Sequence, residues 1–317
     1  MLAVRFEGGR LHVADQPLPE PSTGEVRVRV HLAGICSTDL EITKGYFGFQ
    51  GTLGHEFVGT VDAPARSFWN AKRVVCSINF VSPKDKLFDR FGFEHHPERS
   101  VLGILNRDGA MAEYVCVPEA NLFEVPESVS DQQAVFTEPL AAALQIGQQV
   151  DLKTIDRACV IGPGRLGILI AACLRQTKVQ TTVIGRNERS LHLPRKWGLT
   201  TTQIDDLVFQ KFPLVVDATG SPAGLQLAMS LTEPRGTLVL KSTFAGKNEV
   251  DLTPIVVDEI RLLGSRCGPF EKSLEVLDSQ NLSVEDLIDG EYELAQAERA
   301  FAHASQPGVR KILLHMP

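Results

Sequence analysis

Long apolar runs are absent from this chain of 317 residues. Nowhere do about 18 apolar residues follow one another, as an ordinary membrane helix requires. The N-terminus also lacks a basic start followed by an apolar stretch, so a secretory signal is not expected. These absences predict a cytoplasmic protein without a membrane partner.

The chain has fewer basic than acidic side chains. The 32 Lys and Arg residues against 39 Asp and Glu residues give a formal net charge of −7. Proteins that bind nucleic acid carry a basic surface for the phosphates, so no nucleic-acid partner is expected. Hydrophobic residues make up 43% and charged residues 22%, close to the averages of globular proteins, and the length suggests two domains.

Paired cysteines are missing as well. The six cysteines are scattered, without any Cys-x-x-Cys pair. A chain of this length can form a large core without disulfides, and a reducing cytoplasm would keep the thiols free. Cys159 and Cys173 lie in apolar runs, where a cysteine acts as a small core residue.

The first part of the chain has the patterning of β-strands. Residues 25–31 alternate strictly between polar and apolar types, which predicts a half-buried strand. Short apolar strands bounded by Gly and Pro, such as 57–61 and 73–77, continue to about Pro126. This spacing predicts a mostly antiparallel, barrel-like domain.

From residue 157 onward, apolar strands alternate with helical segments, which predicts a parallel sheet with crossover helices. The expected strands are 158–161, 181–184, 214–217 and 237–240, and the expected helices are 166–176 and 224–231. Before them, 131–150 is expected to be helical, with Ser130 as its N-cap and a kink at Pro139. The last fifty or so residues are short for a domain and are expected to return to the first one.

A glycine motif between the first of these strands and its helix fits the dinucleotide-binding pattern G-x-G-x-x-G. The residues assigned to a cofactor are Gly162, Gly164, Arg165, Leu166 and Gly167. The first glycine permits the tight turn, the second lets a pyrophosphate approach the backbone, and the third lets the helix pack against the strand. The alternative is a plain glycine turn between strand and helix.

The end of the next strand indicates which nicotinamide cofactor is bound. A domain that selects NAD carries an acidic residue there, which binds the ribose 2′-hydroxyl. This chain has Arg186 at that position and Arg189 one turn later. A guanidinium suits a 2′-phosphate by charge and by bidentate hydrogen bonding, which favours NADP(H) over NAD(H). The alternative is that Arg186 only stacks on the adenine and that either cofactor is accepted.

Three potential metal ligands, Cys36, His55 and Glu56, are expected at strand ends of the β domain. One thiolate, one imidazole and one carboxylate suit a tetrahedral zinc ion with an open position. Taken singly, these residues are more often structural, because an isolated cysteine usually lies in a core and an isolated His-Glu pair at the surface.

Together, in this order and spacing, the motifs resemble those of the zinc-dependent medium-chain dehydrogenases, the superfamily of the alcohol, sorbitol and threonine dehydrogenases. The resemblance covers nearly the whole chain and includes the segments 36–39, 54–59, 108–114, 138–141, 162–167, 217–220 and 264–268. It implies an α/β fold with two domains. The implied domains are a discontinuous GroES-like β-barrel catalytic domain, 1–138 with 267–317, and a Rossmann domain with a doubly wound parallel sheet, 139–266.

The resemblance implies a single catalytic zinc. Cys36 and His55 are similar to the direct zinc ligands of the family. Glu56 stands where the family has a glutamate that can approach the metal. Glu138 stands where the polyol and threonine dehydrogenases place another metal-side glutamate.

Further roles follow from the same resemblance. Asp39 is similar to the carboxylate that orients the ligand histidine, and Thr38 to the hydroxyl that takes the proton from the alcohol. Glu41 either continues this proton relay or is a solvated helix residue. Thr219 and Arg266, in two of the later motifs, are implied to contact the nicotinamide cofactor.

The implied activity is hydride transfer between a nicotinamide cofactor and a small-molecule secondary alcohol, polyol or sugar-like substrate, in a homodimer or homotetramer. Two alternatives remain. One is a zinc-free reductase of the quinone oxidoreductase kind. The other is a dinucleotide-binding protein of the same fold that has no catalytic activity.

Four cysteines that bind a structural zinc in many relatives are lacking. Counted along the chain, their positions read Ser82, Asp85, Phe88 and His96, which cannot form a closed thiolate site. No structural zinc is therefore expected. The pair His95–His96, followed by a proline in a charged segment, is expected at the surface.

Overall fold

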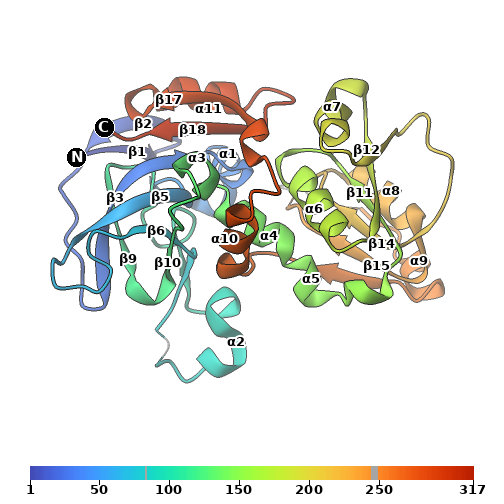
Figure 1. The fold of residues 1–317 in the computed structure, drawn as a ribbon, viewed down its shortest axis with the longest axis horizontal. Helices are drawn as coiled ribbons and strands as arrows, with labels where there is room; N and C mark the ends of the chain where they lie inside the picture. Colours follow the sequence, from blue (N-terminus) through green and yellow to red (C-terminus); the bar gives the residue numbers. More distant parts are fainter. Residues whose placement is uncertain (83, 244–248) are drawn as a thin grey trace. The chain divides into compact units, whose positions relative to one another are not determined.

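The computed structural model describes residues 1–82, 84–243 and 249–317 of the chain. It divides into two compact units, called unit 1 and unit 2 below (Figure 1). Unit 1 comprises Met1–Glu138 and Phe270–Pro317, and unit 2 comprises Pro139–Pro269. Among the described helices, none combines the length and the apolar character of a membrane span.

Unit 1 is built on mostly antiparallel sheets. Its strands are β1 (Leu2–Glu7), β2 (Arg10–Asp15), β3 (Glu25–Gly34), β4 (Gly51–Thr52), β5 (Glu56–Ala63), β6 (Arg73–Cys76), β7 (Asn79–Phe80), β8 (Ser100–Val101), β9 (Tyr114–Pro118), β10 (Leu122–Glu124), β17 (Ile288–Glu293) and β18 (Lys311–His315). The main sheet has the order β10-β6-β5-β3-β18-β17, with β9 also paired to β3, and a smaller sheet has the order β2-β1-β4. Because β18 pairs antiparallel with β3, the C-terminal segment completes the sheet formed by the N-terminal strands.

The alternation in β3 decides which of its faces is buried. Val26, Val28 and Val30 are at most 1% exposed and belong to the apolar core of unit 1, whereas Arg29 points to solvent. Burial of each valine stabilises the fold by about 1.5 kcal/mol or more. The expected half-buried strand is confirmed.

The helices of unit 1 are short. They are α1 (Ser37–Ile42), α2 (Phe88–His95), α3 (Asp131–Ala134), α10 (Phe270–Asp278) and α11 (Ala297–Ala304), with the 3-10 turns η1 (Tyr46–Gly48), η2 (Glu119–Asn121), η4 (Val284–Leu287) and η5 (Leu294–Gln296). Helix α4 (Thr137–Leu144) contains the boundary between the units.

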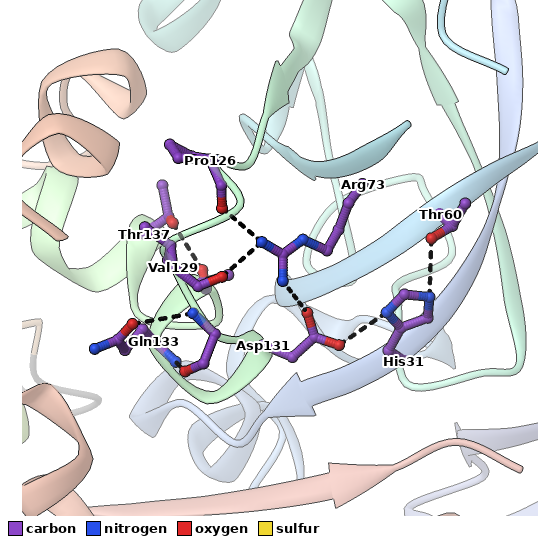
Figure 2. A network of polar contacts seen from close by, with 10 residues as sticks. His31, Thr60, Arg73, Pro126, Val129, Asp131, Gln133 and Thr137 are labelled. Carbon is purple, nitrogen blue, oxygen red and sulfur yellow. Dashed lines mark hydrogen bonds and ion pairs between the residues drawn. The ribbon is translucent and has the colours of Figure 1, made fainter. Parts of the chain in front are cut away.

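A polar network fastens α3 to the main sheet (Figure 2). Asp131, the first residue of α3, lies 2.9 Å from His31 Nδ1 and accepts a hydrogen bond from Arg73 Nη1 at 3.1 Å. The other end of the His31 ring lies 3.0 Å from Thr60 Oγ1. The hydrogen bond with His31, aided by the charge of Arg73, holds the pKa of Asp131 below its usual value. The network fixes the chain just before it enters α4.

Unit 2 has one parallel sheet with crossover helices. Its strands are β11 (Arg157–Ile161), β12 (Gln180–Gly185), β13 (Thr200–Gln203), β14 (Phe212–Asp217), β15 (Thr232–Leu240) and β16 (Arg261–Gly264), in the order β13-β12-β11-β14-β15-β16. Its further helices are α5 (Ile146–Gln149), α6 (Arg165–Gln176), α7 (Glu188–Lys196), α8 (Pro222–Leu231) and α9 (Thr253–Val257), with the 3-10 turn η3 (Leu152–Thr154). This is the strand order of a doubly wound dinucleotide-binding domain, so the expected α/β fold is confirmed. Cys159 and Cys173 are buried in it, as expected.

The segment 131–150 is mostly helical as expected, but the expected kink at Pro139 is wrong. The segment forms α3, α4 and α5, and the helical structure is interrupted at 135–136 and at Gln145. Pro139 is the third residue of α4, in the first turn, where its missing N–H leaves no hydrogen bond unmade. Ser130 is the N-cap of α3 as expected, because its side chain accepts a hydrogen bond from Gln133 N.

Candidate metal and dinucleotide sites

Three potential metal ligands converge where β3 ends and β5 begins. Cys36 is the N-cap of α1, His55 immediately precedes β5, and Glu56 is the first residue of β5. The two strands pair antiparallel with Gly34 opposite Glu56, so their ends lie side by side. One ligand atom from each of the three residues lies within 4.8 Å of the others.

Asp39 ties the two ligand-bearing loops together from a fully buried position. Its Oδ2 accepts a hydrogen bond from Cys36 N at 2.8 Å, and its Oδ1 accepts one from Gly54 N at 3.3 Å. The same Oδ1 lies 3.4 Å from His55 Nδ1. An imidazole that faces a carboxylate through one nitrogen presents its other nitrogen to a metal, so Asp39 has the geometry of an orienting carboxylate.

The charges around His55 decide its protonation. Burial alone would lower the pKa of His55, but the charges of Asp39 and Cys36 together outweigh burial and raise that pKa well above its usual value. Because a metal ion binds the neutral imidazole, the ion and a proton would compete for this ring.

Lys311 pairs with Glu56 in the interior of unit 1. The two side chains are 2% and 1% exposed, and Lys311 Nζ donates a hydrogen bond to Glu56 Oε2. The ammonium also lies 5.6 Å from the centre of the Phe136 ring. Gly34 leaves room for the carboxylate, because a Cβ at that position would lie 2.6 Å from Glu56 Oε2. No sequence motif predicts that Lys311 lies beside the metal ligands. The sequence shows only a charged residue at the start of an apolar strand.

The donor set of this site fits zinc. A thiol sulfur, an imidazole nitrogen and a carboxylate oxygen are the ligands that zinc prefers in proteins, and Asp39 supplies the outer carboxylate. Cys36 and His55 would hold the ion, with Glu56 beside them. Thr38 adjoins the set, since its Oγ1 lies 3.8 Å from Cys36 Sγ.

Two further predicted site residues lie outside this group of three ligands. Glu41, on α1, forms an ion pair with Lys44 at 2.8 Å, and its side chain is 32% exposed. Glu138 is the second residue of α4 and the last residue of unit 1. The potential metal group found among the described residues does not include Glu138.

The glycine loop between β11 and α6 has the shape of a phosphate cradle. Gly162 has φ +92°, a conformation that other residues rarely adopt, and a Cβ on Gly167 would lie 2.0 Å from Gly162 O. A Cβ on Gly164 would meet nothing within 4 Å, so the backbone there borders open space. A pyrophosphate fits this space, facing the N-terminus of α6, which Arg165 and Leu166 open.

The other predicted cofactor residues lie at the carboxyl ends of the neighbouring strands. Arg186 follows β12, and Arg186 and Arg189 are both exposed. Thr219 follows β14 and donates its hydroxyl to Asp217 Oδ1 at 2.7 Å, and Arg266 follows β16 closely. These residues share with the glycine loop the edge of the sheet at which dinucleotides bind.

Known proteins resemble this chain over most of its length. The alcohol dehydrogenase GroES-like domain matches residues 22–127. The chain is 29% identical to the starvation-sensing protein RspB of Escherichia coli K12, over 81% of this chain and 80% of RspB. It is 25% identical to the sorbitol dehydrogenase of Halalkalibacterium halodurans, over 98% of each. These matches support the zinc-type medium-chain dehydrogenase superfamily for this chain.

Solved structures described as alcohol dehydrogenases share the fold. RspB from E. coli CFT073, solved as an alcohol dehydrogenase with NADH, matches with a TM-score of 0.89 and 26% identity over 99% of each chain. The alcohol dehydrogenase TADH of Thermus sp. ATN1 matches with a TM-score of 0.89 and 25% identity over 100% of each chain. The expected combination of a GroES-like and a Rossmann domain is confirmed.

The segment 77–104, called the lobe below, has none of the four structural-zinc cysteines and contains an Asp–His pair. His95 is exposed, but His96 is 0% exposed, so the expected surface position is wrong for His96. His96 Nδ1 accepts a hydrogen bond from Glu98 N at 3.2 Å, which leaves Nε2 to donate to Asp85 Oδ1 at 3.0 Å. The backbone N–H of Leu87 and the His96 ring hold the pKa of Asp85 below its usual value. The hydrogen bond between Asp85 and His96 links two parts of the lobe that are 11 residues apart in the sequence.

Proposed function

We propose that the protein is a zinc-dependent oxidoreductase that transfers a hydride between a nicotinamide cofactor and a secondary alcohol, polyol or sugar-like substrate. The observation that carries this proposal is the convergence of Cys36, His55 and Glu56 around Asp39, in a chain that also has a dinucleotide loop. The similarity to a sorbitol dehydrogenase supports a polyol or a related alcohol as the substrate.

The metal site would hold one zinc ion, which, when bound, polarises the substrate oxygen and makes its proton easier to remove. Cys36 and His55 would be the fixed ligands, and Glu56 and Glu138 the glutamates that approach the metal. We place no second zinc in the lobe, because Asp85 and His96 already engage each other.

Thr38 would move the proton of the substrate hydroxyl. Its Oγ1 adjoins Cys36 Sγ, so it would hydrogen bond to an oxygen bound at the same site. Glu41 lies one turn further along α1 and is partly exposed, so it would pass the proton towards solvent. If Glu41 is only a solvated residue, its ion pair with Lys44 accounts for its position.

The cofactor is proposed to be NADP(H) in preference to NAD(H). Arg186 is exposed directly after β12, where a 2′-phosphate on the adenosine ribose would lie, and Arg189 is one turn away. A phosphate paired with a guanidinium forms charge-assisted hydrogen bonds that a 2′-hydroxyl does not. The relative RspB was solved with NADH, so the preference rests on these two arginines.

Replacing Arg186 by alanine is expected to weaken NADPH binding by about tenfold to a hundredfold, because charge-assisted hydrogen bonds contribute about 1.5–3 kcal/mol. Binding of NADH is expected to change little. Fluorescence titration with both reduced cofactors measures the effect. Arg195→Ala is the matched control, because Arg195 pairs with Glu188 on the same helix. Equal losses for NADPH and NADH in Arg186→Ala would contradict the assignment.

A panel of secondary alcohols and polyols, assayed with NADP+ and NAD+ before and after chelation, tests the proposed activity. Turnover that disappears on chelation and returns with added zinc is the expected result. Turnover that survives exhaustive chelation would favour the zinc-free reductase. Cofactor binding without turnover across the panel would favour the non-catalytic alternative.

The protein is proposed to be a cytoplasmic homo-oligomer, either a dimer or a tetramer. In the described part of the sheet of unit 2, β16 lies at the edge and pairs only with β15, and an open edge can pair with another chain. Leu262 on β16 is 45% exposed, and Val256 and Val257 on α9 are 75% and 72% exposed. The six cysteines, all in the described part of the chain, form no disulfides, which is consistent with a reducing cytoplasm. Light scattering that gives 34.7 kDa, the mass of one chain, would contradict the oligomer.

A further inference from the structure

Lys241 is held at the carboxyl edge of the parallel sheet, directly after β15. Its backbone N–H donates to Asp217 O, at the end of β14, at 3.0 Å. Its Nζ donates to Ser265 Oγ, just beyond β16, at 3.3 Å, and to Ala142 O on α4 at 2.6 Å. The backbone of Ser265 is in turn bound to Leu240 O at 3.1 Å. The ammonium is therefore fixed near the ends of β14, β15 and β16.

The strand order indicates which half of a dinucleotide lies at this edge. In this fold the pyrophosphate lies at the glycine loop after the central strand, and the two nucleosides extend to either side of it. That loop follows β11, which lies between β12 and β14. Arg186, after β12, marks the adenosine side. The nicotinamide therefore belongs on the side of β14, β15 and β16, where Lys241 is held.

We propose that Lys241 acts as a fixed positive charge beside the nicotinamide and favours the reduced cofactor over the oxidised one. The inference rests on the proposed function. The nicotinamide ring is cationic in NADP+ and neutral in NADPH, whereas the rest of the cofactor is the same in both. A nearby ammonium repels the oxidised ring only, so it weakens NADP+ binding relative to NADPH binding. Lys241 thus biases the bound cofactor towards the form that reduces carbonyl compounds.

The ratio of the dissociation constants for NADP+ and NADPH tests this role without requiring turnover. Lys241→Met keeps the length of the side chain and removes its charge, and the ratio is expected to fall by about fivefold, as for a unit charge several ångströms away in a partly screened site. Lys241→Arg keeps the charge and should keep the ratio. Lys211→Met is the matched control, because Lys211 precedes β14 at the opposite edge of the sheet and pairs with Asp258.

Each outcome decides between an electrostatic and a purely structural role. A lysine that only braces α4 against the sheet would, when replaced, weaken both cofactors by the same factor, and that result would overturn the inference. An unchanged ratio together with unchanged affinities would overturn it as well. If the wild-type protein binds neither NADP+ nor NADPH, the proposed function itself is wrong. The role of Lys241 is tested separately, by the ratio of dissociation constants in the variants.

Discussion

Replacing Cys36 by serine is expected to abolish bound zinc and to lower kcat/KM for an alcohol substrate by about a thousandfold or more. Serine is a much poorer zinc ligand than a thiolate, and the loss of the metal removes several kcal/mol of transition-state stabilisation, at about 1.4 kcal/mol for each factor of ten. The fold should survive, because serine is close to cysteine in size and the Cys36 side chain is only half-buried. Elemental analysis, circular dichroism and steady-state kinetics on the same preparation measure the three effects.

Cys116→Ser is the matched control for this variant. Cys116 is also half-buried, but it lies on β9 opposite Arg27, near the other end of β3 from Cys36. At about 3.3 Å per residue, this places it roughly 20 Å or more from the metal ligands. Zinc content and activity should be those of the wild type. Full activity in Cys36→Ser, or equal losses in the two variants, would refute the assignment of Cys36.

Replacing Lys311 by methionine is expected to destabilise unit 1 by about 3–5 kcal/mol in the metal-free protein. Methionine fills a similar volume, but it leaves the Glu56 carboxylate, 1% exposed, without its opposite charge. The double variant Lys311→Met/Glu56→Gln should recover part of this loss, since it removes the buried charge as well. Urea unfolding followed by Trp69 fluorescence in a Trp197→Phe background reports on unit 1, because Trp69 belongs to unit 1 and Trp197 to unit 2.

Lys72→Met provides the comparison for the buried pair. Lys72 and Glu124 form an ion pair at 2.7 Å, but the side chains are 25% and 55% exposed. An exposed pair contributes about 0–1 kcal/mol, since water screens it and the free side chains are well solvated. If Lys311→Met cost no more than Lys72→Met, the claim that the buried Lys311–Glu56 pair stabilises unit 1 would be wrong.

The sequence was most informative where a pattern is local. The alternation of β3 follows from burial of one face, and the glycine loop from the contacts that only glycine permits, as between Gly167 and Gly162. Both features are set by neighbours a few residues apart. The same holds for the Cys-x-Thr-Asp turn, in which Asp39 accepts a hydrogen bond from Cys36 N. The fold class was therefore accessible from local patterns, whereas the joining of Cys36 with His55 and Glu56 depends on the pairing of β3 with β5 and was expected from the family resemblance.

Contacts between segments that are distant in the sequence could not be predicted from local patterns. Lys311 and Glu56 are 255 residues apart in the sequence, and only the pairing of β18 with β3 brings them together. His96 is buried and donates a hydrogen bond to Asp85, although its own segment is charged and polar. Helix α7 is likewise not indicated, since Pro194 lies inside it. In each case tertiary contacts outweigh the local preference.

Metal content per chain, determined by elemental analysis of protein purified without added zinc, tests the central claim most directly. The account predicts about one zinc per chain, which Cys36→Ser loses and Cys116→Ser keeps. A value near two would mean that the lobe of Asp85 and His96 binds metal after all. No zinc, even after zinc is added back and excess is removed, would contradict a zinc-dependent dehydrogenase.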